Sequence, residues 1–121
     1  MARILIIDDD DHILKALHQM LEIEGHKVID ASNGKEGLKL FRENGADLVI
    51  TDILMPEKQG LEMIEELRRD FPHVKIIAMS GGGRVGPYDY LDMARKSGAL
   101  LTLTKPFDRE ELLEAVNAVL E

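Results

Sequence analysis

The chain has 121 residues, of which 45% are hydrophobic and 31% are charged. This length and balance indicate one globular domain over residues 1–121 and exclude a disordered or fibrous chain. Cysteine is absent, which excludes disulfides and thiolate metal sites and leaves the cytoplasm as the expected compartment. The net charge of -8 disfavours binding to nucleic acid or to a membrane surface, so we expect protein or cation partners.

The first residues are not typical of a targeting segment. Their apolar run covers only residues 4–7 and ends in aspartates without a cleavage site. No later stretch is apolar over a length that could span a membrane. Neither a linker nor a repeat is visible, so we expect a domain without an output domain attached, whether it acts alone or was cut from a longer chain.

Short apolar runs alternate with helical periodicity along the chain. The runs predict five strands, at residues 3–7, 26–29, 47–51, 74–80 and 100–104. Apolar residues at helical spacing predict four helices, around residues 13–21, 38–41, 61–67 and 112–120, and a fifth is expected near residues 87–97.

Local start and stop signals agree with these helices. N-cap residues with a carboxylate three positions later precede two of them, as Asn33 with Glu36 and Asp108 with Glu111. Residues that typically end or begin a helix stand at other boundaries, namely Gly25, Gly45, Gly98 and Pro87. The resulting order is (βα)₅. Because the runs at 3–7 and 47–51 are continuously apolar, the sequence predicts a doubly wound α/β fold, with helices on both faces of a parallel sheet.

Polar side chains stand at the ends of four predicted strands. Asp8 and Asp9 follow the first strand, Asp52 follows the third, Ser80 ends the fourth and Lys105 follows the fifth. Ligand sites of open α/β sheets form beyond the carboxyl ends of the strands. We therefore expect these three carboxylates, the hydroxyl and the ammonium to meet at one edge of the sheet.

Three neighbouring carboxylates need a counter-charge, since each pair repels by roughly 1 kcal/mol in water and by about 4 kcal/mol at an effective dielectric of 20. Lys105 supplies one positive charge, so a hard divalent ion such as Mg²⁺ is expected beside it. A metal-neutralised carboxylate next to a lysine and a hydroxyl has the groups for nucleophilic phosphoryl transfer. Asp52 is favoured as the nucleophile because it stands alone after a central strand, whereas Asp8 and Asp9 are paired.

Four segments together resemble the signatures of response-regulator receiver domains: IIDDDD, TDILMP, MSGG and TKPF. The likeness covers the whole chain in the right order. It implies a flavodoxin-like fold with a five-stranded parallel sheet in the order 2-1-3-4-5. It also implies a two-component receiver that takes a phosphoryl group from a sensor histidine kinase or a phosphotransfer protein. Such a domain catalyses its own phosphorylation and slow dephosphorylation rather than turnover of a separate substrate.

The resemblance assigns the metal site and the phosphoacceptor. Asp52 accepts the phosphoryl group. Asp9, Asp52 and the backbone carbonyl of Leu54 ligate Mg²⁺, or Mn²⁺ in its place, with Asp8 close by through water. Asp10 falls outside the site, as does Asp11, and both are expected at a solvated helix start.

The resemblance also assigns a switch. Ser80 turns towards the phosphoryl oxygens, Gly81 offers them a backbone N–H, Lys105 pairs with them, and the bond from Lys105 to Pro106 is cis. Phosphorylation adds roughly -1.5 to -2 charges and three acceptor oxygens, so these contacts exist in one state and bias a two-state equilibrium. A downstream protein, or a second copy of the chain, then reads the face made by the fourth helix, the fifth strand and the fifth helix.

Three features depart from the usual family pattern. Thr102 stands where an aromatic residue usually forms the second half of the switch. Leu100 and Leu101 stand where polar residues are common, which indicates an apolar patch for a partner or a dimer. The glycine-rich segment 81–90 is longer than usual and is expected to be a mobile loop rather than a phosphate-binding loop.

The histidines share no ligand spacing and are expected at the surface: His12, His18, His26 and His73.

Three rival functions agree with only part of the sequence. Phosphatases with an aspartate nucleophile want a second aspartate two residues on, and Leu54 in that position cannot transfer a proton. A flavin mononucleotide carrier shares the fold class, but the aspartates after the first strand would repel the flavin phosphate. A phosphorylation-independent interaction module is supported by Thr102 and opposed by the complete set of three carboxylates with Lys105.

Overall fold

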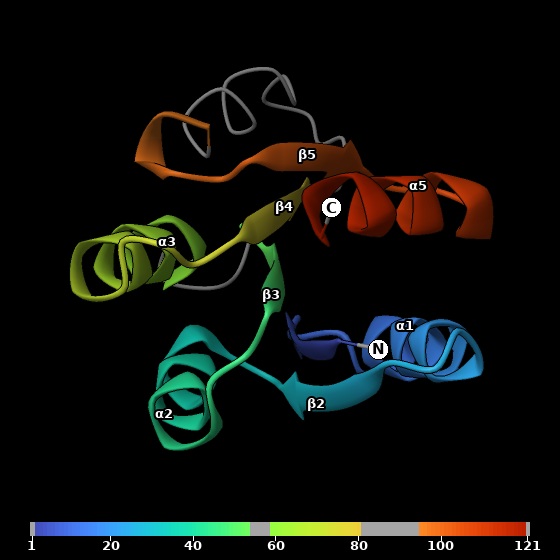
Figure 1. Ribbon diagram of the computed structural model, residues 1–121, viewed down its shortest axis with the longest axis horizontal. Coiled ribbons are helices and arrows are strands. Elements are labelled where there is room, and N and C mark those ends of the chain that lie inside the picture. Colours follow the sequence, from blue (N-terminus) through green and yellow to red (C-terminus); the bar gives the residue numbers. More distant parts are fainter. Residues whose placement is uncertain (1, 54–58, 81–94, 121) are drawn as a thin grey trace.

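The structure is a computed structural model that describes residues 2–53, 59–80 and 95–120. Its strands form one parallel sheet in the order β2-β1-β3-β4-β5 (Figure 1). The strands are β1 (Arg3–Ile7), β2 (Lys27–Ala31), β3 (Leu48–Asp52), β4 (Ile76–Ser80) and β5 (Leu101–Thr104). The helices are α1 (Asp11–Ile23), α2 (Gly34–Asn44), α3 (Gln59–Asp70) and α5 (Arg109–Leu120).

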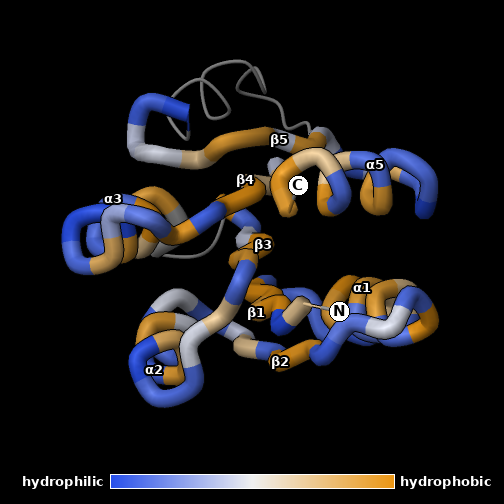
Figure 2. The backbone as a smooth tube through the Cα atoms, in the orientation of Figure 1, coloured by the Kyte–Doolittle hydropathy of each residue, from blue (hydrophilic) through white to orange (hydrophobic). Residues whose placement is uncertain are grey.

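The helices cover both faces of the sheet, which confirms the predicted doubly wound α/β fold. In Figure 1, α1 and α5 lie on one face and α2 and α3 on the other. Two hydrophobic cores result, one on each face. β3 and β4 are buried along their whole length, because side chains on both of their faces pack under helices. Figure 2 shows the same division, with hydrophobic residues gathered along the central strands.

The local helix signals lie where the sequence predicts them. The Asn33 side chain accepts a hydrogen bond from the Glu36 N–H at 2.8 Å, and that of Asp108 accepts one from the Glu111 N–H at 2.8 Å. The Glu111 carboxylate in turn accepts one from the Asp108 N–H at 3.2 Å, which completes a reciprocal capping box. Positive φ angles occur at the three glycines expected at helix ends, which are Gly25, Gly45 and Gly98.

Two strand boundaries differ from the prediction by two residues, and the others differ by at most one. β2 runs to Ala31, beyond the predicted end at residue 29, because its pairing with β1 continues as far as Ile7. β4 begins at Ile76 rather than at residue 74, because the Val74 N–H donates to the Phe71 carbonyl at 3.0 Å and so closes the turn after α3. Val74 is still buried, so its apolar side chain is a core contact without being part of the strand.

The helix expected near residues 87–97 is described only at its end, where residues 95–97 are helical. Pro87 and the segment 81–90 lie outside the described residues. Among the helices that the structure describes, none combines the length and the apolar character needed to cross a membrane.

Candidate metal centre

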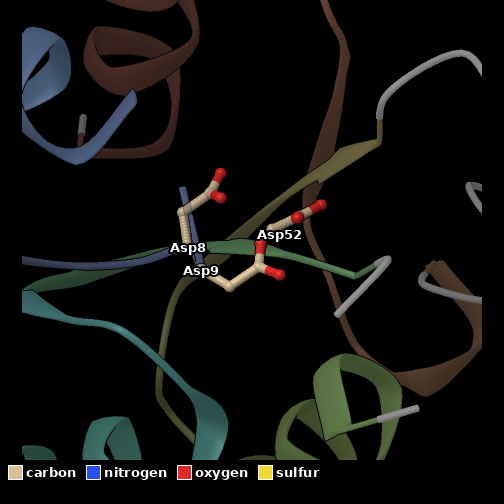
Figure 3. A group of neighbouring side chains, drawn as sticks. All are labelled: Asp8, Asp9 and Asp52. Carbon is tan, nitrogen blue, oxygen red and sulfur yellow. The ribbon is translucent and has the colours of Figure 1, made fainter. Parts of the chain in front are cut away.

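Three carboxylates meet at the carboxyl edge of the sheet. β1 and β3 are neighbours, and Ile7 pairs with Thr51, so Asp8, which follows β1, and Asp52, which ends β3, lie at the same edge. One oxygen from each of Asp8, Asp9 and Asp52 lies within 4.8 Å of the others (Figure 3). Asp8 and Asp52 are buried and Asp9 is exposed. The structure therefore brings together the three carboxylates that the sequence predicts at the ends of two different strands.

Asp8 is held from three sides and is fully buried. Its backbone N–H donates to the Ala31 carbonyl of β2 at 3.1 Å. Its Oδ1 accepts from the Asp10 N–H at 2.9 Å, and its Oδ2 accepts from Lys105 Nζ at 2.7 Å. These contacts compensate the cost of burying a carboxylate and leave it little freedom to turn.

Lys105 brings a positive charge to the cluster from the far end of the chain. Its backbone N–H donates to the Ser80 carbonyl at 2.7 Å, which fixes the residue at the end of β5. Its Nζ lies 2.7 Å from Asp8 Oδ2 and 3.6 Å from Asp52 Oδ2. The peptide bond to Pro106 is cis. In this state Lys105 pairs most closely with Asp8, a partner that the resemblance did not imply.

Asp52 ends β3 in a tightly bonded stretch of backbone. Its carbonyl accepts a hydrogen bond from Thr51 Oγ1 at 3.0 Å, and the next N–H, that of Ile53, donates to the Met79 carbonyl of β4 at 3.0 Å. Only 5% of Asp52 is exposed. Its carboxylate is therefore positioned by a rigid strand end, and access to it is restricted.

Ser80 is fully buried at the end of β4, and its Oγ has no hydrogen-bond partner among the described residues. A buried hydroxyl without a partner costs about 1–3 kcal/mol, so such a group in a native fold needs an explanation. An acceptor oxygen bound at the cluster would supply the missing bond. A buried hydroxyl without a partner is therefore consistent with a group that binds a ligand.

The residues of the expected output face are partly described. Thr102 is half-buried opposite Ala78 of β4, and its Oγ1 accepts a hydrogen bond from Arg95 Nη2 at 3.4 Å. Leu100 is 53% exposed and Leu101 36%, in agreement with the predicted apolar patch. Two further residues assigned by the resemblance, Leu54 and Gly81, lie outside the described residues.

Asp10 and Asp11 lie at the start of α1, as predicted, whereas His18 makes more contacts than expected. Asp10 is the N-cap of α1 and accepts from the His12 and Ile13 N–H groups, and Asp11 lies in the first turn. His18, expected as an ordinary surface residue, instead contacts two carboxylates. The contact with Glu22 could have been predicted from the sequence, because Glu22 stands four residues after His18 on the same helix.

The donor set suits a hard divalent cation. The cluster offers carboxylate oxygens, the ligands that Mg²⁺ prefers, and three carboxylates with one ammonium carry a net charge of about -2, since -3 + 1 = -2. One carboxylate is exposed, so an ion can reach the cluster while the other two are held in the protein. The arrangement can bind a cation and hold an incoming anionic group between it and Lys105.

Comparisons with known proteins agree with this site. A family model described as the response regulator receiver domain matches residues 4–117. Protein PilH of Pseudomonas aeruginosa is 38% identical over 120 residues, which cover 99% of this chain and 98% of PilH. The chain spans only 26% to 51% of several other curated relatives, which are transcriptional regulatory proteins.

Solved structures show the same fold. A response regulator receiver domain protein from Clostridium thermocellum superposes with a TM-score of 0.90 at 38% identity, covering 99% of this chain and 94% of that one. The response regulator TrrA from Thermotoga maritima, solved in complex with Mg²⁺-BeF, gives a TM-score of 0.85 at 35% identity, covering 98% and 99%.

Proposed function

Since the chain belongs to the response regulator receiver domain family, we propose that Asp52 accepts a phosphoryl group from the phosphohistidine of a sensor histidine kinase or a phosphotransfer protein. One observation carries this assignment: Asp52 is buried beside two other carboxylates, with Lys105 Nζ 3.6 Å from its Oδ2. A buried, strand-fixed carboxylate with a cation beside it is suited to attack phosphorus.

Asp9, Asp52 and the backbone carbonyl of Leu54 would hold Mg²⁺, with Asp8 close by through water and Mn²⁺ as an alternative ion. When bound, the ion supplies positive charge that offsets the carboxylates and the phosphoryl oxygens. Two observations support this choice: the close approach of the three carboxylates, and the Mg²⁺-BeF complex of the related TrrA.

The chain's own residues account for the transfer. An Asp52 carboxylate oxygen forms the new bond to phosphorus as the bond from phosphorus to the donor imidazole nitrogen breaks, and that nitrogen keeps the electron pair and regains a proton from water. Lys105 is close enough to exchange its bond to Asp8 for one to a phosphoryl oxygen. The product is an aspartyl phosphate, which water then removes slowly. We therefore propose self-phosphorylation rather than turnover of a foreign substrate.

The proposed switch consists of Ser80 and Thr102. The buried Ser80 hydroxyl gains a phosphoryl acceptor, and the Gly81 N–H is proposed to bind the same group. Thr102 is too small to act as an aromatic switch, but its contact with Arg95 links β5 to the helical residues 95–97. The face made by these residues, β5 and α5 would then be read by a downstream protein or by a second copy of the chain, and the exposed Leu100 supports an apolar contact there.

An apolar groove beside the site suits the phosphoryl donor. It has a volume of about 440 Å³ and lies between α1 and the segment after β5. Its lining combines the apolar side of α1 with the residues next to the site lysine, namely Ile13, Ala16, Leu17, Met20, Lys105, Pro106 and Phe107. A donor helix seated in this groove would bring its histidine to the carboxyl edge of the sheet, where Asp52 lies.

We also propose that residues 1–121 make up one receiver domain and that it acts in the cytoplasm. The family match over residues 4–117 supports the first statement. The absence of cysteine from the chain supports the second.

Intact-mass measurement tests the proposed function. The protein is incubated with Mg²⁺ and either acetyl phosphate or a phosphorylated histidine phosphotransfer protein, beside an Asp52→Asn control. The expected result is a base-labile adduct of one phosphoryl group that needs Mg²⁺ and is missing from the control. A folded, Mg²⁺-binding protein that gains no adduct from either donor would overturn the proposal and favour a phosphorylation-independent interaction module.

A further inference from the structure

His18 lies between two carboxylates that come from different elements. Its Nδ1 is 2.6 Å from Oδ1 of Asp30, which lies on β2. Its Nε2 is 3.1 Å from Oε2 of Glu22, one turn further along α1. The His18 side chain is 30% exposed, so its ring is partly shielded from water. β2 is an edge strand of the sheet, so the contact with Asp30 joins α1 to one edge of the sheet.

Both ring nitrogens face acceptors, and this makes the arrangement dependent on a proton. A carboxylate accepts hydrogen bonds and cannot donate one when ionised. The imidazolium form of His18 donates from both nitrogens and satisfies Asp30 and Glu22 together. The neutral ring carries a single N–H, so one of its nitrogens would present a lone pair to a carboxylate oxygen. Only the protonated ring can therefore hold both partners.

The charged groups around the ring favour protonation. Asp30 faces it from β2 and Glu22 from α1. Cations on the other neighbouring elements are engaged elsewhere: Arg3 of β1 donates to the Asn44 carbonyl and Arg109 of α5 to Glu24. Partial burial lowers the pKa of His18, but the hydrogen bonds and charges of the two carboxylates outweigh it, and the pKa lies above the ordinary 6.5.

We propose that His18 is a proton-dependent clip that fastens α1 to the edge strand β2. The clip is closed when the ring is protonated and loses one of its two bonds when the proton leaves. The residues of this clip are distinct from those of the acidic cluster, and the clip does not depend on the proposed function. It acts at a surface that the acidic cluster does not include.

The two elements that the clip joins also hold Asp8. Asp30 directly precedes Ala31, whose carbonyl accepts from the Asp8 N–H, and the N-cap of α1, Asp10, donates its N–H to Asp8 Oδ1. His18 thus closes a ring of contacts that runs from Asp8 through β2 to α1 and back. Opening the clip would loosen the supports of this carboxylate without touching the carboxylate itself.

The direction of the pH effect follows from linkage. The folded-state pKa of His18 is raised above 6.5, so its contribution to stability is fully present below about pH 6.5 and is lost as the pH rises through the folded pKa. The clip is therefore closed at mildly acidic pH and opens on the alkaline side of 6.5.

Titration of the histidine rings by nuclear magnetic resonance, on the full chain with Mg²⁺ present, is the direct test. The titration midpoint of His18 is expected to lie above the ordinary 6.5. Asp30→Asn and Glu22→Gln should each lower this midpoint. A His18 midpoint at or below 6.5, or one that neither substitution changes, would overturn the proposal.

Hydrogen exchange tests the mechanical consequence. His18→Gln should lower the protection factors of α1 and β2 amides about three- to tenfold near pH 6 and change them little near pH 8. His12→Gln is the matched control and should change neither. If His18→Gln does not fold, Asp30→Asn tests the same contact from the strand side. Equal losses of protection at both pH values would show an ordinary packing contact and would contradict the clip.

Discussion

Lys105 makes its closest charged contact with Asp8, at 2.7 Å, and lies 3.6 Å from Asp52. At the scale of single residues, it matters that the lysine lies nearer to Asp8 than to Asp52, because Asp8 is fully buried and Asp52 nearly so. The lysine therefore stabilises the folded chain before any phosphoryl group arrives. Its later contact with a phosphoryl oxygen would replace one anionic partner by another, which keeps the ammonium paired throughout.

Replacing this lysine should expose the cost of the buried charge. Lys105→Met leaves Asp8 buried without its cation and is expected to lower the free energy of unfolding by about 3 kcal/mol. The combined change with Asp8→Asn should cost less than the sum of the single changes, because the neutral amide no longer needs the cation. Urea unfolding without divalent ions measures both. Lys39→Met, at an exposed position of α2, is the control. An equal loss of unfolding free energy in Lys105→Met and Lys39→Met would contradict the prediction.

At the scale of elements, α2 approaches β1 more closely than a side chain would allow. A Cβ placed on Gly37 would overlap the Cδ1 and Cγ1 atoms of Ile7, which is fully buried in β1. Glycine normally weakens a helix interior by about 1 kcal/mol relative to alanine. Its presence here is explained by the helix–sheet contact, which places α2 against the strand that ends at the acidic site.

This contact reverses the usual effect of replacing a helical glycine. Gly37→Ala is expected to destabilise the fold by about 1–3 kcal/mol, because the added methyl group displaces Ile7. Ile7→Val removes the Cδ1 atom and should recover part of the loss in the double variant, although by itself it costs about 0.5–1.5 kcal/mol. Thermal unfolding of the four proteins measures the cycle, and a Gly37→Ala variant as stable as the parent would refute the close approach.

At the scale of the whole molecule, the fold brings together like charges from strands that are distant in sequence. The three carboxylates come from residues 8, 9 and 52, and the cation from residue 105. Folding must therefore overcome their mutual repulsion, and any cation that binds the cluster stabilises the folded state over the unfolded one.

Replacing the exposed Asp9 should separate the repulsion among the carboxylates from the stabilisation by a bound cation. Without divalent ions, Asp9→Asn is expected to raise the free energy of unfolding by about 1 kcal/mol, because it removes repulsion from the cluster. Mg²⁺ at about 100 times its dissociation constant should stabilise the parent protein by about 2.7 kcal/mol and the variant by much less. Melting temperatures with and without Mg²⁺ measure both effects. Asp11→Asn, in the first turn of α1, is the control and should keep the full Mg²⁺ response.

The amino-acid sequence by itself determined the features that depend on neighbouring residues. The strand and helix order, the caps at Asn33 and Asp108 and the buried character of β3 follow from periodicity and local hydrogen bonding, which act within a few residues. The residues at the strand ends could also be named in advance, because parallel strands of a doubly wound sheet all present their carboxyl ends at one edge.

The tertiary structure decided which of these groups touch and which lack a partner. Packing explains why Lys105 pairs with Asp8 and why His18 of α1 contacts Asp30 of β2. It also explains why the Ser80 hydroxyl has no partner among the described residues. The two contacts join residues at least twelve positions apart in the sequence, at 2.7 Å between Lys105 and Asp8 and at 2.6 Å between His18 and Asp30. Sequence patterns of spacing and polarity do not encode such distances, because they arise only when the helices settle on the two faces of the sheet.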